Sequence, residues 1–441
     1  MRQGFDPREL SDFARYYGFH YDSLDPEALA GEVEVDMGRG LEGLPSSLPM
    51  IPSYIAPGRG PPAGKTVLAL DAGGTNLRAS RVSFDGEGGA TAGEAERRPM
   101  PGSRGRASAT EFFDAIADAA LPALGGGGVD GIGFTFSYHM DMRPDADGVL
   151  RAFSKEIDAP EVVGMAVGAG LREALARRGR AYDGPISLLN DTAATLLSGI
   201  AAIPGGGGPV VGFILGTGLN TAYPEPSIPK IGFESAGSPQ IVVCESGGFR
   251  LRYRGDLDRE FDAATRNPGA FTLEKTASGA YIGPLTMHIL KRAVRDGAIR
   301  LDRADEFLAL EGVDTRAMNE FLCAPFSAGG GPLRPLFGPG ERGAAASALY
   351  LASIVAERGA ALVAAALAAT ARRAARGGGD PLAPVRIAVE GTAYMAYKGM
   401  RRAIEARLHG LLARGRPLPY VIAPVEQASL IGAAVAAAGR A

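Results

Sequence analysis

The sequence predicts an α/β protein with a duplicated architecture, in which apolar strands alternate with helices. Three turns rich in glycine and threonine predict it, and each follows an apolar strand: residues 73–74, 216–218 and 391–392. Glycine leaves backbone N–H groups uncrowded, so such turns can surround a phosphate. Any one turn alone also fits an ordinary hairpin. Their spread over the whole chain predicts two halves that hold one polyphosphate from two sides.

The first turn carries the clearest chemistry. An apolar run ends at Asp71, and an alternating run from Leu77 to Phe84 follows, which is a hairpin pattern. Asp71 and Thr75 flank the glycines, so a carboxylate, a hydroxyl and several N–H groups would converge there. A phosphate with its metal requires these groups.

Composition excludes several classes of function. The 441 residues are enough for two or three domains with a cleft between them. A net charge of −3 with 22% charged residues gives no basic surface for nucleic acid or an anionic membrane. The N-terminal residues lack the apolar segment of a secretory signal. Glu357 and Arg358 interrupt the apolar stretch 344–371, which predicts buried helix rather than a membrane span. Cys244 and Cys323 form no pairing or metal pattern, so we expect a cytoplasmic protein.

In the first half, apolar spacing predicts helices, and runs of β-formers predict strands. We expect helices at 7–18, 26–40, 108–124, 161–178 and 192–200, strands at 66–71, 77–84, 131–137 and 186–190, and a linker at 56–65. Asp191 or Thr192 is positioned to cap the helix that follows the last of these strands.

The second half repeats the strand, turn and strand pattern between residues 209 and 225. Further strands are expected at 241–249 and 385–389, and a helical stretch at 271–294 with breaks at Gly279 and Gly283. Residues 256–262 are polar and read as surface, and residues 300–345 read as loop-rich. Two alanine-rich helices precede the third turn, and a helix from Leu430 closes the chain.

Gly64-Lys65-Thr66 resembles the end of a Walker A loop. The glycines at 58 and 60 miss the required spacing, and the Lys-Thr pair precedes a strand, whereas a P-loop follows a strand and opens a helix. The stretch therefore predicts a linker and no nucleotide site.

Asp191 is the sharpest catalytic candidate. It ends an apolar strand, where α/β proteins bind ligands, and the Asn190 amide lies beside it. A carboxylate there can accept the proton of an attacking alcohol. The same residue also fits a simple helix cap.

Three further residues have both a functional and an ordinary interpretation. Lys155 could stabilise a transferring phosphoryl group or lie solvated at the surface. Glu245 and Glu274 could accept hydrogen bonds from sugar hydroxyls, or serve as ordinary turn and helix-surface acids. The sequence has no HExxH motif, no cysteine cluster and no GxSxG motif, which argues against a catalytic zinc and against a nucleophilic triad.

The blocks LALDAGGTNLR, FTFS, LLNDTAATL, LGTGLN, ESGGF, NPGAFTLEK and VEGTAY occur in an order and spacing that resembles hexokinase, the actin-like sugar kinase family. The resemblance runs from SSLPMIPSYI to the closing helix. It implies an α/β, two-domain actin-like ATPase fold (ribonuclease H-like), with duplicated mixed sheets flanked by helices and an interdomain cleft. The implied small domain is 64–200, completed by the C-terminal helix 425–441, and the large domain is 1–63 with 201–424.

The resemblance further implies ATP and Mg²⁺ as cofactors and a hexose, glucose first, phosphorylated at its 6-hydroxyl. Asp191 would be the general base, and Lys155 would assist phosphoryl transfer. The implied sugar contacts are Ser137, Ser154, Lys155, Asn190, Asp191, Asn220, Glu245 and Glu274. The implied nucleotide contacts are Asp71, Gly73, Gly74, Thr75, Asn76, Arg78, Thr217, Gly218, Gly391, Thr392 and Ser429, with Asp71 holding Mg²⁺ through water.

Some residues depart from the family pattern. Tyr138-His139 stands where an aromatic residue followed by proline is usual, Ser154 replaces threonine, Ala194 replaces glycine and Ser246 replaces tryptophan. Two alternatives stay open: a non-catalytic sugar sensor, and another actin-like protein such as a filament or chaperone ATPase or a kinase of the repressor/ORF/kinase group. That group's zinc-binding cysteines are absent from this sequence. We expect a monomer or homodimer, with no nucleic-acid or membrane partner.

Overall fold

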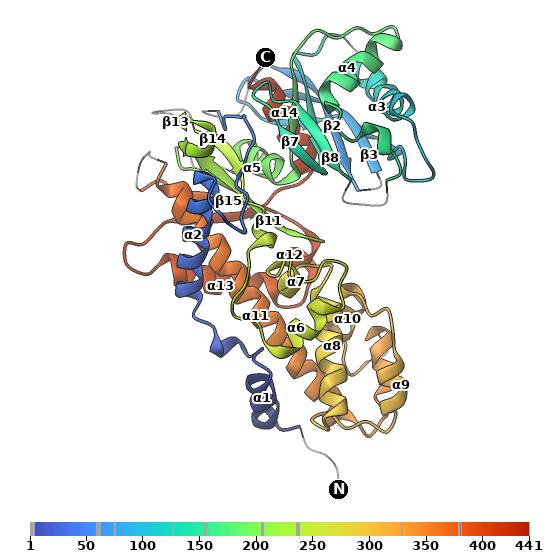
Figure 1. Cartoon of the computed structure of the whole chain (residues 1–441), viewed down its shortest axis with the longest axis vertical. Coiled ribbons are helices and arrows are strands. Elements are labelled where there is room, and N and C mark those ends of the chain that lie inside the picture. Colours follow the sequence, from blue (N-terminus) through green and yellow to red (C-terminus); the bar gives the residue numbers. More distant parts are fainter. Residues whose placement is uncertain are drawn as a thin grey trace.

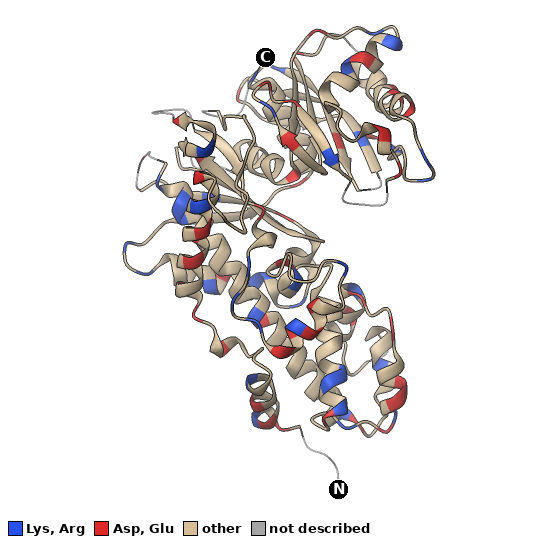
Figure 2. Cartoon of the chain, in the orientation of Figure 1, with Lys and Arg blue, Asp and Glu red and all other residues tan. Residues whose placement is uncertain are grey.

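The computed structural model describes residues 5–58, 63–74, 76–125, 127–153, 157–203, 207–234, 239–327, 329–377, 380 and 382–440. One lobe, at the top of Figure 1, contains a mixed sheet with the C-terminus, and a second sheet and a long helical region lie below it. Positive and negative residues are interspersed over both parts (Figure 2).

The upper sheet has the strand order β4-β3-β2-β6-β9, and β5 also pairs with β3. Its strands are β2 (Thr66–Gly73), β3 (Asn76–Phe84), β4 (Ala90–Ala92), β5 (Glu96–Pro99), β6 (Gly131–Phe136) and β9 (Ile186–Leu189). Alternate residues of β2 face opposite sides, as the two-residue period of a strand requires. Leu68 and Leu70 join the core under α3 (Ala109–Leu124) and α4 (Val167–Arg177), whereas Val67 and Ala69 face α14 (Ala428–Ala438).

The lower sheet has the order β1-β14-β11-β10-β15-β16. Its strands are β1 (Ile51–Pro52), β10 (Val210–Leu215), β11 (Leu219–Glu225), β14 (Gln240–Val243), β15 (Val385–Glu390) and β16 (Tyr420–Pro424). Val211 and Phe213 pack with α11 (Arg342–Ala375), and Val210 packs with α5 (Asp191–Ala202) on the other face.

Helices α5 and α14 lie between the two sheets and share one apolar cluster with both. Their backbones approach closely because small residues meet there. A Cβ on Gly432 of α14 would lie 2.0 Å from the Ala194 carbonyl oxygen of α5, and one on Gly212 of β10 would lie 2.4 Å from the Thr192 carbonyl oxygen. No larger side chain fits at either glycine without moving backbone.

The remaining helices are α1 (Pro7–Tyr16), α2 (Pro26–Glu42), α6 (Asp256–Ala263), α7 (Glu274–Ala277), α8 (Ile282–Arg295), α9 (Ala304–Ala309), α10 (Thr315–Cys323), α12 (Thr392–Ala396) and α13 (Met400–Leu412). Two small hairpins pair β7 (His139–Met142) with β8 (Gly148–Ala152), and β12 (Ser227–Ile228) with β13 (Phe233–Glu234). Local signals start several helices. Asp6 and Asp25 cap α1 and α2 ahead of a proline, and Ser108 forms a capping box with Glu111 on α3.

Four sequence-based expectations about helices were wrong. The two alanine-rich helices are one helix, α11, because Arg358 stays within it by pairing with the buried Asp258. Residues 300–345 contain α9 and α10 rather than loop alone, and residues 256–262 form α6 with two buried acids. The stretch 161–178 becomes α-helical only at Val167. The helical stretch expected at 271–294 breaks at Gly279 as predicted, between α7 and α8, whereas Gly283 lies inside α8.

Helix α11 has the length and apolar composition of a membrane span, but 89% of its most apolar window is buried inside the protein. A core helix of a folded domain has this environment, as the sequence predicted.

Candidate active site

Strand ends from both sheets meet at a cavity of about 430 Å³. Ten of the residues implied by the resemblance line it: Asp71, Gly73, Asn76, Arg78, Ser137, Asp191, Thr217, Gly391, Thr392 and Ser429. They come from the two glycine turns of the sheets, the start of α5, the end of β15 and the start of α14. Segments more than 300 residues apart in sequence therefore converge on one space.

Asp71 lies at the end of β2 and is 4% exposed. Its cross-strand partner in the β2–β3 register is Arg78, whose Nε donates to Asp71 Oδ2 over 2.8 Å. The Ser137 hydroxyl lies 3.8 Å from where a Cβ on Gly73 would be. The turn that follows is fixed from the side, since the Tyr138 hydroxyl donates to the Gly74 carbonyl oxygen over 2.7 Å.

The β10–β11 turn forms the opposite wall. Gly216 N–H donates to the Gly218 carbonyl within the turn, and Gly279 N–H donates to the Gly216 carbonyl over 2.7 Å. Gly391, at the end of β15, has φ 129°, and a Cβ there would lie 2.3 Å from the Leu215 carbonyl group. Only glycine satisfies both conditions, so this residue brings the third predicted turn against the second.

Asn190, rather than Asp191 or Thr192, caps α5, which corrects the sequence-based expectation. Its Oδ1 accepts from Thr192 N–H over 2.7 Å. Asp191 is the first residue of the helix and its carboxylate lines the cavity, where Oδ1 accepts from the Thr192 hydroxyl over 3.2 Å. The capping role that competed with a catalytic role for Asp191 is thus filled by its neighbour.

Glu245 lies beside this cavity in a left-handed conformation, with φ 57°. A non-glycine residue in that region stores backbone strain, and such residues gather at functional sites. Asn220 Nδ2 donates to Glu245 Oε1 over 2.7 Å. Asn220 Oδ1 accepts from the N–H groups of Thr221 and Ser246, which fixes the orientation of the amide.

The acids of this region interact. Burial raises the pKa of Glu245 to about 7, the Asn220 hydrogen bond opposes the rise, and the charges of Asp191 and Glu274 add to it. Burial also raises the pKa of Glu274, whose Oε2 accepts from Leu219 N–H over 3.1 Å. Gly218 faces the same oxygen, since a Cβ there would lie 2.9 Å from it. Asp191 and Glu274 therefore both lie close enough to Glu245 for their charges to act on it.

A second cavity, of about 610 Å³, opens on Glu245. The β7 strand supplies one wall, including His139 and Met140. Residues of the segments 47–52, 245–250 and 269–271 in the other lobe supply the rest. Glu245 thus faces a cleft lined from both lobes.

Within the described residues, no group of three or more His, Cys, Asp or Glu side chains could hold a metal by itself. The residues present suit a different arrangement, in which one carboxylate, Asp71, supplies hard oxygen to a cation that keeps its waters and binds phosphate oxygens. Mg²⁺ is usually bound in this way.

Three of the implied residues, Thr75, Ser154 and Lys155, lie outside the described residues. Two charged residues of the cavity were missed by the sequence reasoning, Arg97 and Glu390. Glu390 ends β15, and burial and then the charge of Asp191 raise its pKa. The strand-end signal that singled out Asp71 and Asp191 applies to Glu390 as well. Arg97 gave no such signal, because it reaches the cavity through its pairing with Arg78 in the β3–β5 register.

Comparisons with known proteins agree with this geometry. Two family models described as hexokinase match residues 12–201 and 210–439. Hexokinase-1 of Oryza sativa subsp. japonica is 31% identical, over 93% of this chain and 86% of the relative. Hexokinase-2, chloroplastic, of Nicotiana tabacum is 33% identical over 62% of this chain and 56% of the relative.

Solved structures show the same fold. A hexokinase from Schistosoma mansoni complexed with glucose superposes with a TM-score of 0.76 at 24% identity, covering 99% of this chain and 100% of that one. A second hexokinase crystal structure gives a TM-score of 0.72 at 25% identity, covering 98% and 96%. The predicted α/β, two-domain actin-like ATPase fold is confirmed.

Proposed function

The chain belongs to the hexokinase family and is a hexose kinase, and on that premise we propose that it transfers the terminal phosphoryl group of ATP to the 6-hydroxyl of glucose, with Asp191 as the general base. One observation carries the assignment of the base. Asp191 lines the same cavity as the glycine turns of both sheets, and its charge reaches Glu245 and Glu390.

Phosphoryl transfer depends on positioning and on stabilisation of spread negative charge more than on covalent chemistry. Asp191 accepts the proton of the attacking hydroxyl. Because the Asn190 Oδ1 caps α5, the Asn190 Nδ2 is the side-chain atom that can donate to a sugar hydroxyl. Asn220, Glu245 and Glu274 bind further hydroxyls, as do Ser137 and Ser154, and Lys155 stabilises the transferring group.

The nucleotide lies between the turns. Gly73, Gly74, Thr75 and Asn76 bind phosphates from one side, and Thr217 and Gly218 from the other. Gly391 and Thr392 contact the adenosine, and Ser429 lies at the phosphate side of α14. Asp71, held by Arg78, binds Mg²⁺ through water, and the cation when bound neutralises charge on the phosphate oxygens.

We assign residues 64–200 and the C-terminal helix 425–441 to a small domain, and 1–63 with 201–424 to a large domain. The packing of α14 on β2 and β6 supports this division, as does the Thr135 hydroxyl bond to the Ser429 carbonyl oxygen, 2.8 Å long. Closure of the two domains over the hexose would exclude water and limit hydrolysis of ATP.

We also propose that the protein acts in the cytoplasm, as a monomer or homodimer without nucleic-acid or membrane partners. Cys244 is buried and Cys323 is exposed, and neither forms a disulfide, which suits a reducing compartment.

The test is hexose-dependent ADP release with MgATP. We expect the Asp191→Ala variant to lose 10²- to 10⁴-fold in kcat, roughly the contribution of a general base. Asp183→Ala, in the exposed loop before β9, is the matched control and should behave as the parent. An Asp191→Ala variant as active as the parent would refute the assignment.

The sugar sensor is the alternative, and it predicts glucose binding by calorimetry with no ADP release. A kinetic panel of glucose, mannose, fructose and glucosamine then ranks the substrates.

A further inference from the structure

We propose that a buried ion pair, Asp262 with Lys275, positions the hexose-binding Glu274 and the adjacent wall of the cleft. The inference rests on the proposed function, because it assigns to Glu274 a sugar contact. Neither residue of the pair lines the cavity of the candidate active site, so both act through the backbone they hold.

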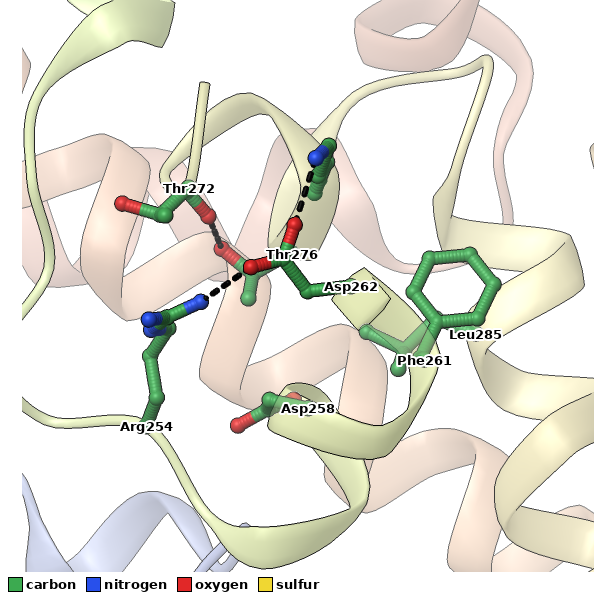
Figure 3. Close-up of a pocket in the computed structure, with 8 residues that line it drawn as sticks. Arg254, Asp258, Phe261, Asp262, Thr272, Thr276 and Leu285 are labelled. Atoms are coloured by element: carbon green, nitrogen blue, oxygen red, sulfur yellow. Dashed lines mark hydrogen bonds and ion pairs between the residues drawn. The ribbon is translucent and has the colours of Figure 1, made fainter. Parts of the chain in front are cut away.

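The pair lies behind Glu274, between α6 and α7. Lys275 Nζ donates to Asp262 Oδ1 over 2.5 Å, and their side chains are 4% and 9% exposed. Arg254 donates to the other oxygen, Asp262 Oδ2, over 2.7 Å, a contact drawn as a dashed line in Figure 3. The Asp262 carboxylate is thus held by two cations, and the charge-assisted bonds are stronger than neutral ones. These contacts lower the pKa of Asp262 against the effect of its burial.

Both partners also hold the loop that precedes Glu274. Asp262 Oδ2 accepts from Gly269 N–H over 2.9 Å, and Lys275 Nζ donates to the Asn267 carbonyl oxygen over 2.6 Å. Residues 269–271 form part of the wall of the 610 Å³ cleft that opens on Glu245. The ion pair therefore connects residues 267–269, where this wall begins, to α7.

The loop is in a conformation that needs such support. Phe271 has φ 53° and is 44% exposed, so neither its backbone preference nor its own burial holds it there. A left-handed non-glycine residue costs roughly 1–3 kcal/mol and persists only where its surroundings fix it. Lys275 N–H donates to the Phe271 carbonyl oxygen over 2.9 Å, so the lysine holds the loop through its backbone as well.

The same loop connects Glu274 to the Glu245 segment. The Thr272 hydroxyl donates to the Phe249 carbonyl oxygen over 2.9 Å and accepts from Leu251 N–H over 2.8 Å. Glu274 itself follows two residues later, and the Lys275 charge opposes the rise in its pKa that burial causes. A shift of the loop would displace both acids that bind the hexose.

A second buried ion pair on α6 provides a matched comparison. Arg358 donates to both oxygens of Asp258, over 2.5 and 2.6 Å, and both side chains are 2% exposed. This pair joins α6 to α11, and the hydrogen bonds of Asp258 within the described residues go to Gly255 and Arg358 rather than to the loop at 267–273. If both buried ion pairs on α6 only stabilise the fold, losing either pair should have the same effect on KM for glucose. The proposal predicts instead that only loss of the Asp262–Lys275 pair raises KM for glucose.

The experiment measures KM for glucose and for ATP, with the thermal midpoint, in Asp262→Asn, Lys275→Met and Asp258→Asn. We expect the first two to raise KM for glucose about tenfold or more, with KM for ATP within about twofold of the parent value. Asp258→Asn should lower the thermal midpoint at least as much and leave KM for glucose within about twofold. If the first two variants do not fold, Lys275→Arg keeps the charge but not the paired Nζ bonds, and the same rise in KM for glucose is expected.

Three results would overturn the proposal. They are an unchanged KM for glucose in folded Asp262→Asn and Lys275→Met, an unchanged KM in Lys275→Arg where only that variant folds, and an equal rise in Asp258→Asn. If the parent itself releases no ADP in the presence of any hexose, the proposed function fails instead, so the two failures are distinguishable.

Discussion

The Asn220 amide and the Glu245 carboxyl group are joined by a 2.7 Å hydrogen bond at the edge of the cleft. Burial raises the pKa of Glu245 to about 7 in spite of this bond, since Asp191 and Glu274 repel a third negative charge. A carboxyl group with this pKa changes its charge near neutral pH.

This pKa predicts a pH dependence of hexose use. A carboxylate accepts hydrogen bonds from sugar hydroxyls only when ionised, and below about pH 7 the free enzyme holds Glu245 protonated. We expect kcat/KM for glucose to fall as the pH drops from 8 to 5.5, because this parameter reports ionisations of the free enzyme. We expect the Glu245→Gln variant to have a lower kcat/KM for glucose that does not fall further between pH 8 and 5.5. A flat profile in the parent, or the same fall in the variant, would contradict the assignment.

The same acid affects stability with a defined sign. Its pKa in the folded protein, about 7, exceeds the reference value of 4.5, so the folded state binds the extra proton between these values. Stability from this group is therefore lost as the pH rises from 4.5 to 7. At about 1.4 kcal/mol per pKa unit, the loss is up to about 3 kcal/mol.

Replacing Glu245 with Gln should remove that loss. At each pH, the free energy of unfolding of the parent is subtracted from that of the variant. We expect this difference to be up to about 3 kcal/mol more favourable to the variant at pH 8 than at pH 4.5. Urea denaturation at both pH values measures it. Glu87→Gln, at an exposed turn, is the control and should show no such gain.

Asp71 is expected to set the magnesium requirement. Asp71→Asn should raise the Mg²⁺ concentration for half-maximal rate about tenfold or more, the usual effect of losing a group that orients a metal through its shell. KM for glucose should stay within about twofold, because we assign Asp71 to the nucleotide and not to the sugar. Rates against free Mg²⁺ at saturating substrates give the answer. Asp85→Asn, in an exposed turn, should match the parent, and an Asp71→Asn variant that does the same would remove Asp71 from the site.

Gly391 is expected to tolerate no side chain. Gly391→Ala adds a Cβ 2.3 Å from the Leu215 carbonyl group and at φ 129°, so strain and overlap combine. We expect a loss of about 3 kcal/mol or more in unfolding free energy, with a raised KM for ATP. Gly399→Ala is the control, since Gly399 also has a positive φ of 81° but open space around it. That variant should lose only about 1–2 kcal/mol, and equal losses in the two variants would show that overlap at Leu215 is unimportant.

Much of the fold and site could be predicted because the signals are local. Asp71 and Asp191 follow apolar strands, and strand ends meet at one edge of a sheet, so their convergence follows from a pattern within a few residues. The capping signals before α1, α2 and α3 are likewise contained in four residues.

The failures have long-range causes. Asp258 and Asp262 look like surface acids because their partners, Arg358 and Lys275, lie 100 and 13 residues away. Arg97 reaches the cavity through strand register, which one sequence does not specify. A charged pair inside an alanine-rich helix looks like a break until its buried partner is known, which is why α11 was divided in two.

The contact of Gly432 with Ala194 could also couple the binding of one substrate to the binding of the other. Helix α5 starts at Asp191, the proposed base, and Ser429, a proposed nucleotide contact, is the second residue of α14; both residues line the same cavity. Because the two helices touch backbone to backbone at this point, a side chain larger than hydrogen at position 432 would push one helix away from the other. A larger residue at position 194 or 432, within about one helical turn of Asp191 or Ser429, would therefore change the separation of the proposed sugar contact from the proposed nucleotide contact.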